Sequence, residues 1–144
     1  MSHIAKISIE IKDLDALAAA CRRVGCELRL GQSTYSWYGT SVGDTLLPEG
    51  FKVEDLGKCE HAVSVPGAGY EVGVVARRDG RPGYALLWDS WSYGGLERKL
   101  GQGARRLVQA YGIEAATRAA RRQGCSVTET VREDGAVVLK VRGS

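Results

Sequence analysis

The sequence predicts an α+β fold, a ferredoxin-like sandwich in which two helices pack on one face of a mainly antiparallel sheet. The chain opens with a strand pattern, a helix pattern and a second short strand pattern within residues 5–30. Further strand patterns follow. A long stretch with apolar residues at helical spacing lies between these strands and the last two strands, which fall within 127–141. Helices that interrupt runs of strands in this way are typical of antiparallel sheets.

The spacing of apolar side chains predicts the β-α-β opening. Residues 5–12 alternate between apolar and polar, which is the period of a half-buried strand. Asp13 suits a helix N-cap because its carboxylate accepts hydrogen bonds from free backbone N–H groups. Apolar residues recur at helical spacing over 14–24, Gly25 suits the helix end, and residues 26–30 predict a second strand.

The remaining elements lie in the second half of the chain. Strand patterns occupy 61–65, 70–77 and 84–88, and a helix pattern runs from about 103 to 123. Two more strands close the chain around a turn at Glu133-Asp134-Gly135.

Composition and length indicate one folded unit. Residues 31–58 lack a regular period, so we expect a single domain over 1–144 with a loop-rich insert at about 31–58. A chain of 144 residues is long enough for a hydrophobic core. Its 44% hydrophobic and 26% charged residues exclude a disordered chain, whose low hydrophobicity could not offset the entropy of ordering.

The sequence also bears on the cellular compartment and on the charge of a partner. No stretch approaches the roughly 18 consecutive apolar residues of a membrane span, and the first residues lack the apolar run of a secretion signal. We therefore expect a cytoplasmic protein with no membrane partner and four free thiols. Residues 1–72 carry a formal charge of −3 and residues 73–144 carry +6. The basic half suits an acidic partner, but complementarity between the two halves, or between subunits, explains it equally well.

Several short stretches occur in a distinctive order over residues 1–30 and 59–142. They are Met1-Ser2-His3, Ile11 to Leu17, His61-Ala62-Val63, Gly69 to Val75, Tyr84 to Asp89, Gln109-Ala110-Tyr111 and Glu133 to Leu139. In this order they resemble the family called domain of unknown function 1257, which includes a hypothetical chloroplast reading frame, cyanobacterial relatives and tailed-phage proteins. The Gly94-Gly95-Leu96-Glu97 turn is more similar to the phage branch. The family has no agreed activity, so the resemblance implies a small protein of unknown function, in the host cytoplasm if phage-encoded.

Cys59 and His61 are the residues that most resemble a metal or catalytic pair. On one strand they would share a face, so they could chelate a metal, or form a nucleophile and base with Asp89 or Glu60. The alternative is a half-buried thiol and a hydrogen-bonded imidazole at a strand start. A structural zinc site needs four ligands, and the other cysteines are scattered. We predict no cofactor and lean against enzymatic activity.

Two aromatic clusters are the most suggestive feature of the sequence. Exposed rings beside arginines would stack on bases while the cations neutralise phosphates. The alternative is that these rings fill the core or a subunit interface, because the chain has only one Phe. The clusters are Tyr35, Trp37 and Tyr38, and Trp88, Trp91 and Tyr93.

Arg105 and Arg106 follow Gly101-Gln102-Gly103 at the start of the long predicted helix. A helix N-terminus with guanidinium groups nearby could bind phosphate, and the alternative is an ordinary helix start.

Three functions remain open at this point. The first is a non-enzymatic module that binds a protein or a second copy of itself, the second is binding of nucleic acid or nucleotides, and the third is a metal protein or enzyme centred on His61. The residues that we expect to bind a ligand or partner are Tyr35, Trp37, Tyr38, His61, Trp88, Asp89, Trp91, Tyr93, Arg105 and Arg106.

Overall fold

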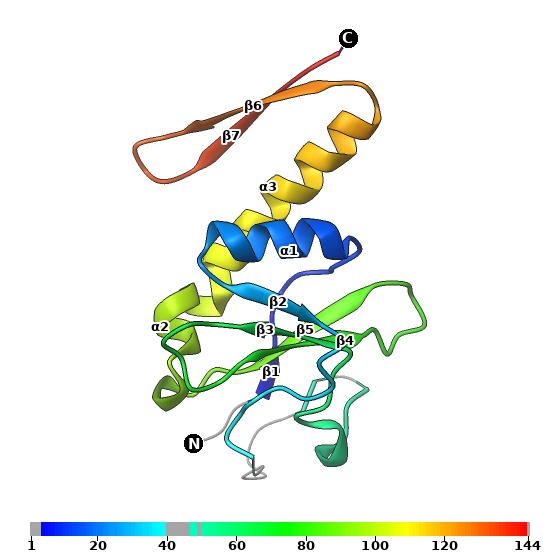
Figure 1. Cartoon of the computed structure of the whole chain (residues 1–144), viewed down its shortest axis with the longest axis vertical. Helices are drawn as coiled ribbons and strands as arrows, with labels where there is room; N and C mark the ends of the chain where they lie inside the picture. Colours follow the sequence, from blue (N-terminus) through cyan, green and yellow to red (C-terminus); the bar gives the residue numbers. More distant parts are fainter. Residues whose placement is uncertain (1–3, 40–46, 49, 144) are drawn as a thin grey trace.

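A five-stranded antiparallel sheet forms the centre of the molecule (Figure 1). The structure, a computed structural model, describes residues 4–39, 47–48 and 50–143. The sheet has the order β1-β5-β4-β3-β2, and every neighbouring pair is antiparallel. Its strands are β1 (Ile4–Lys6), β2 (Glu27–Leu30), β3 (His61–Ser64), β4 (Val72–Ala76) and β5 (Tyr84–Asp89). The chain is therefore α+β with a mainly antiparallel sheet, as the sequence predicts.

The ferredoxin-like arrangement is not confirmed. β1 and β2 occupy the two opposite edges of the sheet, with β5, β4 and β3 between them. The β-α-β opening is present, but three strands separate its two strands because β2 to β5 run as a consecutive meander. The first strand is also shorter than predicted: regular pairing stops at Lys6, and Ile11 pairs with Tyr84 only as an isolated bridge.

Three helices contribute to the core on one side of the sheet, which we call the helix face. They are α1 (Leu14–Arg23), α2 (Leu96–Leu100) and α3 (Arg105–Arg122). Asp13 caps α1 as predicted, since its Oδ1 accepts the N–H of Ala16 at 3.0 Å. The Tyr111 hydroxyl of α3 accepts the N–H groups of Lys12 and Asp13, which fixes α3 against the start of α1. Buried sheet residues on this face include Val63, Val74, Leu86 and Trp88.

The described parts of the loop-rich segment 31–58 cover the opposite side of the sheet, the loop face. Its described parts contain only an isolated bridge and one short 3-10 turn, Val53–Asp55. Buried Tyr35, Phe51 and Leu56 from this segment pack against Ala62, Val75 and Leu87 of the sheet. Gly73 makes this packing possible, because a β-carbon there would lie 2.4 Å from the Tyr35 ring. The insert is thus the second covering layer of the sheet.

The last two strands form a hairpin apart from the main sheet and beside α3 (Figure 1), and the hairpin turn reaches Gln109, whose Nε2 donates to the Gly135 carbonyl at 3.3 Å. They are β6 (Ser126–Val131) and β7 (Val137–Arg142), and their predicted turn is present. Arg23 of α1 forms ion pairs with both Glu114 of α3 and Glu129 of β6, and so ties the hairpin to the helices. Most hairpin residues are nevertheless exposed.

No helix among the described residues combines the length and the apolar character needed to cross a membrane.

Candidate functional site

The six candidate aromatic residues divide into buried and exposed rings. Tyr35 and Trp88 are each 3% exposed and belong to the core, on the loop face and the helix face respectively. Trp37 is half-buried against the loop-face core, where Gly57 leaves room for its indole. Tyr35 and Trp88 are therefore core residues and Trp37 is partly covered by the core, so we leave these three residues out of the candidate binding surface.

The other three rings form a continuous column in which Tyr38 and Tyr93 are exposed and Trp91, between them, is half-buried. Tyr38 meets Trp91 edge-on, with ring centroids 5.0 Å apart and planes at 85°. Trp91 stacks on Tyr93 with centroids 5.3 Å apart and planes at only 26°. Tyr93 is 82% exposed and Tyr38 is 47% exposed. The column therefore begins on a partly covered ring and ends on a ring that is open to solvent.

A buried carboxylate fixes the backbone on which two of these rings are mounted. Asp89, the last residue of β5, is fully buried. Its Oδ2 accepts the N–H of Tyr38 and its Oδ1 accepts the N–H of Trp91, both at 3.1 Å. Asp89 is therefore a positioning residue beneath the column rather than a group in contact with a ligand.

Tyr70, which the sequence did not single out, is half-buried beside the loop that carries Trp91 and Tyr93. Its ring lies directly on the backbone of Gly94, where a β-carbon would approach to 1.9 Å. The loop is held there by a hydrogen bond from the Gly69 N–H to the Gly94 carbonyl at 2.8 Å. Partial burial, then the nearby charge of Asp89 and the hydroxyls of Tyr38 and Tyr93, raise the pKa of Tyr70. The alternation of 70–77 predicted a strand residue, but β4 begins only at Val72.

We call the rings of Tyr38, Tyr70, Trp91 and Tyr93 the aromatic surface. Two exposed cations of α2 lie beside the loops that carry it. The Arg98 guanidinium lies 3.0 Å from the position of a β-carbon at Gly95, and the Lys99 ammonium lies 2.9 Å from that position at Gly67. Neither forms an ion pair with a carboxylate of the described residues. Their charges therefore remain available to an anion.

The predicted arginines lie elsewhere. Arg105 and Arg106 are exposed on the first turn of α3, and both line a shallow groove shared with Asp134 and Gly135 of the hairpin turn. The Arg106 guanidinium donates to the Lys99 carbonyl at 3.2 Å. Ala104 at the N-cap makes no side-chain hydrogen bond to the first turn of α3, and the phosphate site predicted here stays a prediction.

The prediction that Cys59 and His61 share a face is wrong. Cys59 precedes β3, packs on the loop-face core, and donates its thiol hydrogen to the Gln32 carbonyl. The His61 ring instead lies 5.4 Å from the Tyr84 ring, and its Nδ1 accepts the Gly31 N–H at 2.9 Å. Burial raises the pKa of Cys59 to about 11, so its thiol is protonated at neutral pH.

Among the residues that the structure describes, no three His, Cys, Asp or Glu side chains come close enough together to hold a metal ion. In the described structure Cys59 is a half-buried thiol and His61 a hydrogen-bonded imidazole, and a metal or catalytic role for either residue stays a prediction.

No protein-family model matches this chain, and neither curated proteins nor solved structures show a significant match to it. The resemblance to the domain of unknown function 1257 family, the phage origin that it implies and the cytoplasmic location therefore stay predictions. Function has to be inferred from the aromatic surface itself.

Proposed function

We propose that this chain is a non-enzymatic binding module whose aromatic surface binds single-stranded nucleic acid. The observation that carries the proposal is the ring column from Tyr38 through Trp91 to Tyr93, which ends on an open ring face. A nucleobase would continue this column, because every base has a flat face that stacks on an aromatic side chain without regard to sequence.

The neighbouring cations favour nucleic acid over a protein partner. Arg98 and Lys99 lie beside the loops of the aromatic surface and have no described carboxylate partner. Backbone phosphates would be neutralised by such cations, with release of counterions. The half of the chain that holds these residues also carries a formal charge of +6. Duplexes should bind less well, since their bases are already stacked.

The test is fluorescence anisotropy with a labelled single-stranded oligonucleotide, as DNA and as RNA, at low salt. Tyr93→Ala removes the terminal ring, whereas Tyr93→Phe keeps the ring and loses only the hydroxyl. Stacking contributes about 1–3 kcal/mol per base, so Tyr93→Ala should weaken binding by roughly 5- to 150-fold. Tyr93→Phe should bind like the wild type. Absence of binding at low salt, or equal loss in both variants, contradicts the proposal.

The C-terminal hairpin favours a second candidate function, self-association. Three of its valines are exposed: Val131 by 67%, Val141 by 52% and Val138 by 39%. Within the described residues β6 and β7 pair only with each other, and a two-stranded hairpin is marginally stable in water. Each strand therefore offers an unpaired edge to another strand.

The sequence of β7 suits pairing with β7 of a second copy. In an antiparallel pair centred on Leu139, Val137 of one copy would lie opposite Val141 of the other, and the two leucines would meet. The equivalent pairing of β6 would instead place two Glu129 carboxylates opposite each other.

Sedimentation equilibrium tests this candidate on the full chain. Val141→Lys should shift a concentration-dependent dimer towards monomer, and Val53→Lys, which changes an exposed valine elsewhere, should not. A wild type that stays monomeric up to millimolar concentration excludes self-association through the hairpin.

A further inference from the structure

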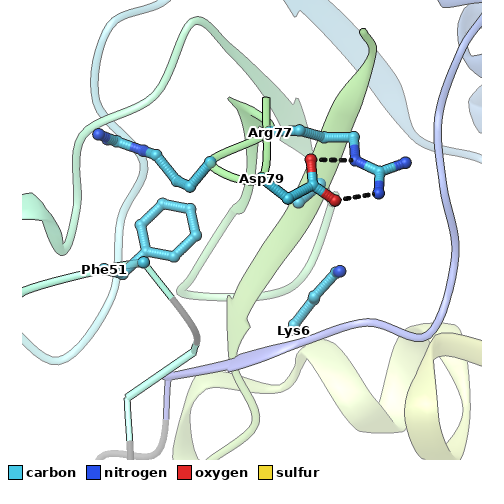
Figure 2. Close-up of a pocket in the computed structure, with 7 residues that line it drawn as sticks. Lys6, Phe51, Arg77 and Asp79 are labelled. Carbon is cyan, nitrogen blue, oxygen red and sulfur yellow. Dashed lines mark hydrogen bonds and ion pairs between the residues drawn. The ribbon is translucent and has the colours of Figure 1, made fainter. Parts of the chain in front are cut away.

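A small pocket, separate from the aromatic surface, lies on the loop face beside the N-terminal end of β5 (Figure 2). Its volume is about 260 Å³. Lys6 of β1, Ala85 of β5, Phe51 of the 31–58 segment and the loop after β4 contribute its walls. Residues that are about 80 positions apart in the sequence thus meet around one concave site.

The pocket has an aromatic wall and an apolar floor. Phe51 and Ala85 are both buried, at 9% and 4% exposure. The guanidinium of Arg78 lies over the Phe51 ring, with its carbon 4.9 Å from the ring centroid. This stack offers an edge against which a second flat group can pack.

The charges around the pocket do not cancel. Arg77, whose side chain is only 7% exposed, forms ion pairs with both Glu10 and Asp79, so these three side chains together carry a charge of −1, which the two charges of Lys6 and Arg78 outweigh. Lys6 has no carboxylate within ion-pair distance among the described residues. In Figure 2 the Lys6 side chain rises towards Asp79, which also lines the pocket. Together with Arg78, Lys6 leaves the concavity electropositive.

We propose that this pocket binds a small aromatic anion, a single ring that carries a carboxylate or a phosphate. The ring packs beside Phe51 and Arg78, and the anionic group pairs with the Lys6 ammonium. The volume supports one ring and one charged group, because sites for drug-sized ligands occupy about 300–1,000 Å³. This site does not depend on the aromatic surface, which contains none of its residues.

The test is an NMR titration of the full chain, followed at the backbone amides of Phe51, Arg78 and Ala85. Benzoate and phenyl phosphate supply ring and anion together, and their relative affinities show which anionic group the pocket prefers. Acetate and inorganic phosphate supply the anion alone, and benzamide supplies an uncharged ring. We expect saturable shifts with the first two probes, and binding at least tenfold weaker with the other three.

Lys6→Met and Arg78→Met should each weaken benzoate binding about tenfold or more, and Lys140→Met, an exposed lysine on the hairpin, should leave it unchanged. Because Lys6 and Arg78 are exposed, both variants are expected to fold, and the spectrum itself reports this. Three results overturn the proposal: no saturation with benzoate or phenyl phosphate, equal binding of benzamide, or binding by Lys6→Met that matches the wild type.

Discussion

The buried and the exposed aromatic rings of this protein come from the same two stretches of sequence, yet they do different things. One stretch begins with buried Tyr35 and ends with exposed Tyr38; the other begins with buried Trp88 and ends with exposed Tyr93. In each stretch the first ring belongs to a sheet face and packs in the core, and the last ring follows a change of chain direction. Residue type therefore does not decide whether a ring is buried. The position of the ring relative to the sheet decides it.

The buried rings contribute to the stability of the fold, whereas the exposed rings are proposed to contribute to binding. Tyr35 and Trp88 remove large apolar surfaces from water and so stabilise the fold. The exposed rings leave most of their surface in water, so their removal should cost the fold little. The two groups thus predict opposite outcomes for the same kind of substitution.

The largest expected effect is that of Trp88→Ala. Loss of this buried ring should lower the free energy of unfolding by about 3–5 kcal/mol, since it leaves a cavity between the sheet and the helices. Tyr93→Ala should change it by no more than about 0.5 kcal/mol. Denaturant unfolding of both variants measures this contrast, and equal losses would remove the distinction between core and surface rings.

Asp89→Asn should have the next largest effect. The amide keeps the shape of the side chain and one acceptor oxygen, but its NH2 group faces whichever of the Tyr38 and Trp91 N–H groups the oxygen does not serve. We expect a loss of about 1–3 kcal/mol in unfolding free energy, together with weaker oligonucleotide binding because the rings lose their support. Glu54→Gln, at an exposed turn, is the control. Normal stability with normal binding would show that Asp89 does not position the rings.

The double variant Arg98→Ala, Lys99→Ala tests the electrostatic part of binding. Each phosphate contact adds about 0.7 to the slope of log affinity against log salt for single strands. Two lost contacts should therefore flatten the slope by about 1.4 while leaving the fold intact. The matched control is Lys140→Ala, Arg142→Ala on the hairpin, and an equal flattening there would assign the effect to net charge alone.

Tyr35→Phe should have the smallest effect, and it should stabilise. The buried Tyr35 hydroxyl makes no hydrogen bond to a described residue, so its removal should gain up to about 1 kcal/mol. Burial also raises the pKa of Tyr35 from 10.0 to about 12. The unfolded chain therefore releases this proton first, and stability falls as pH rises from about 10 towards 12.

In Tyr35→Phe the fall in unfolding free energy that the Tyr35 hydroxyl causes at alkaline pH should disappear. The fall caused by the buried thiol of Cys21 and the half-buried thiol of Cys59 should remain. Unfolding curves at several alkaline pH values for both proteins would reveal this, and identical pH dependence would contradict the buried state of the hydroxyl.

Periodicity in the sequence was enough to predict most elements, because each is a local pattern. The Asp13 cap, the stop at Gly25, β5, α3 and the closing hairpin all follow from neighbouring residues. Strand order did not follow, since the pairing of β1 with β5 joins residues more than 80 positions apart. Nor did local pattern indicate that the insert would cover the loop face.

The candidate site could be predicted only in part, because it too depends on contacts between residues that are far apart in the sequence. Tyr38, Trp91 and Tyr93 were selected as candidates together with Tyr35 and Trp88, because nothing in the local sequence distinguishes the two groups. The buried rings can be distinguished from the exposed ones only when the position of each ring relative to the sheet is known. Tyr70, Arg98 and Lys99 join the surface only because the loop before β4 docks on Gly94, a contact between distant residues. The Gly-rich stretch before Tyr70 was the one local sign of such a close approach.

The most direct test of the aromatic surface is a single NMR titration that follows the indole N–H signals of the tryptophans as single-stranded oligonucleotide is added. Trp91 is half-buried in the ring column and Trp88 lies in the core, three residues away in the sequence, so one spectrum contains both site and control. We predict a saturable shift of the Trp91 signal with the Trp88 signal unmoved. An unmoved Trp91 signal at saturating oligonucleotide would contradict the proposed function.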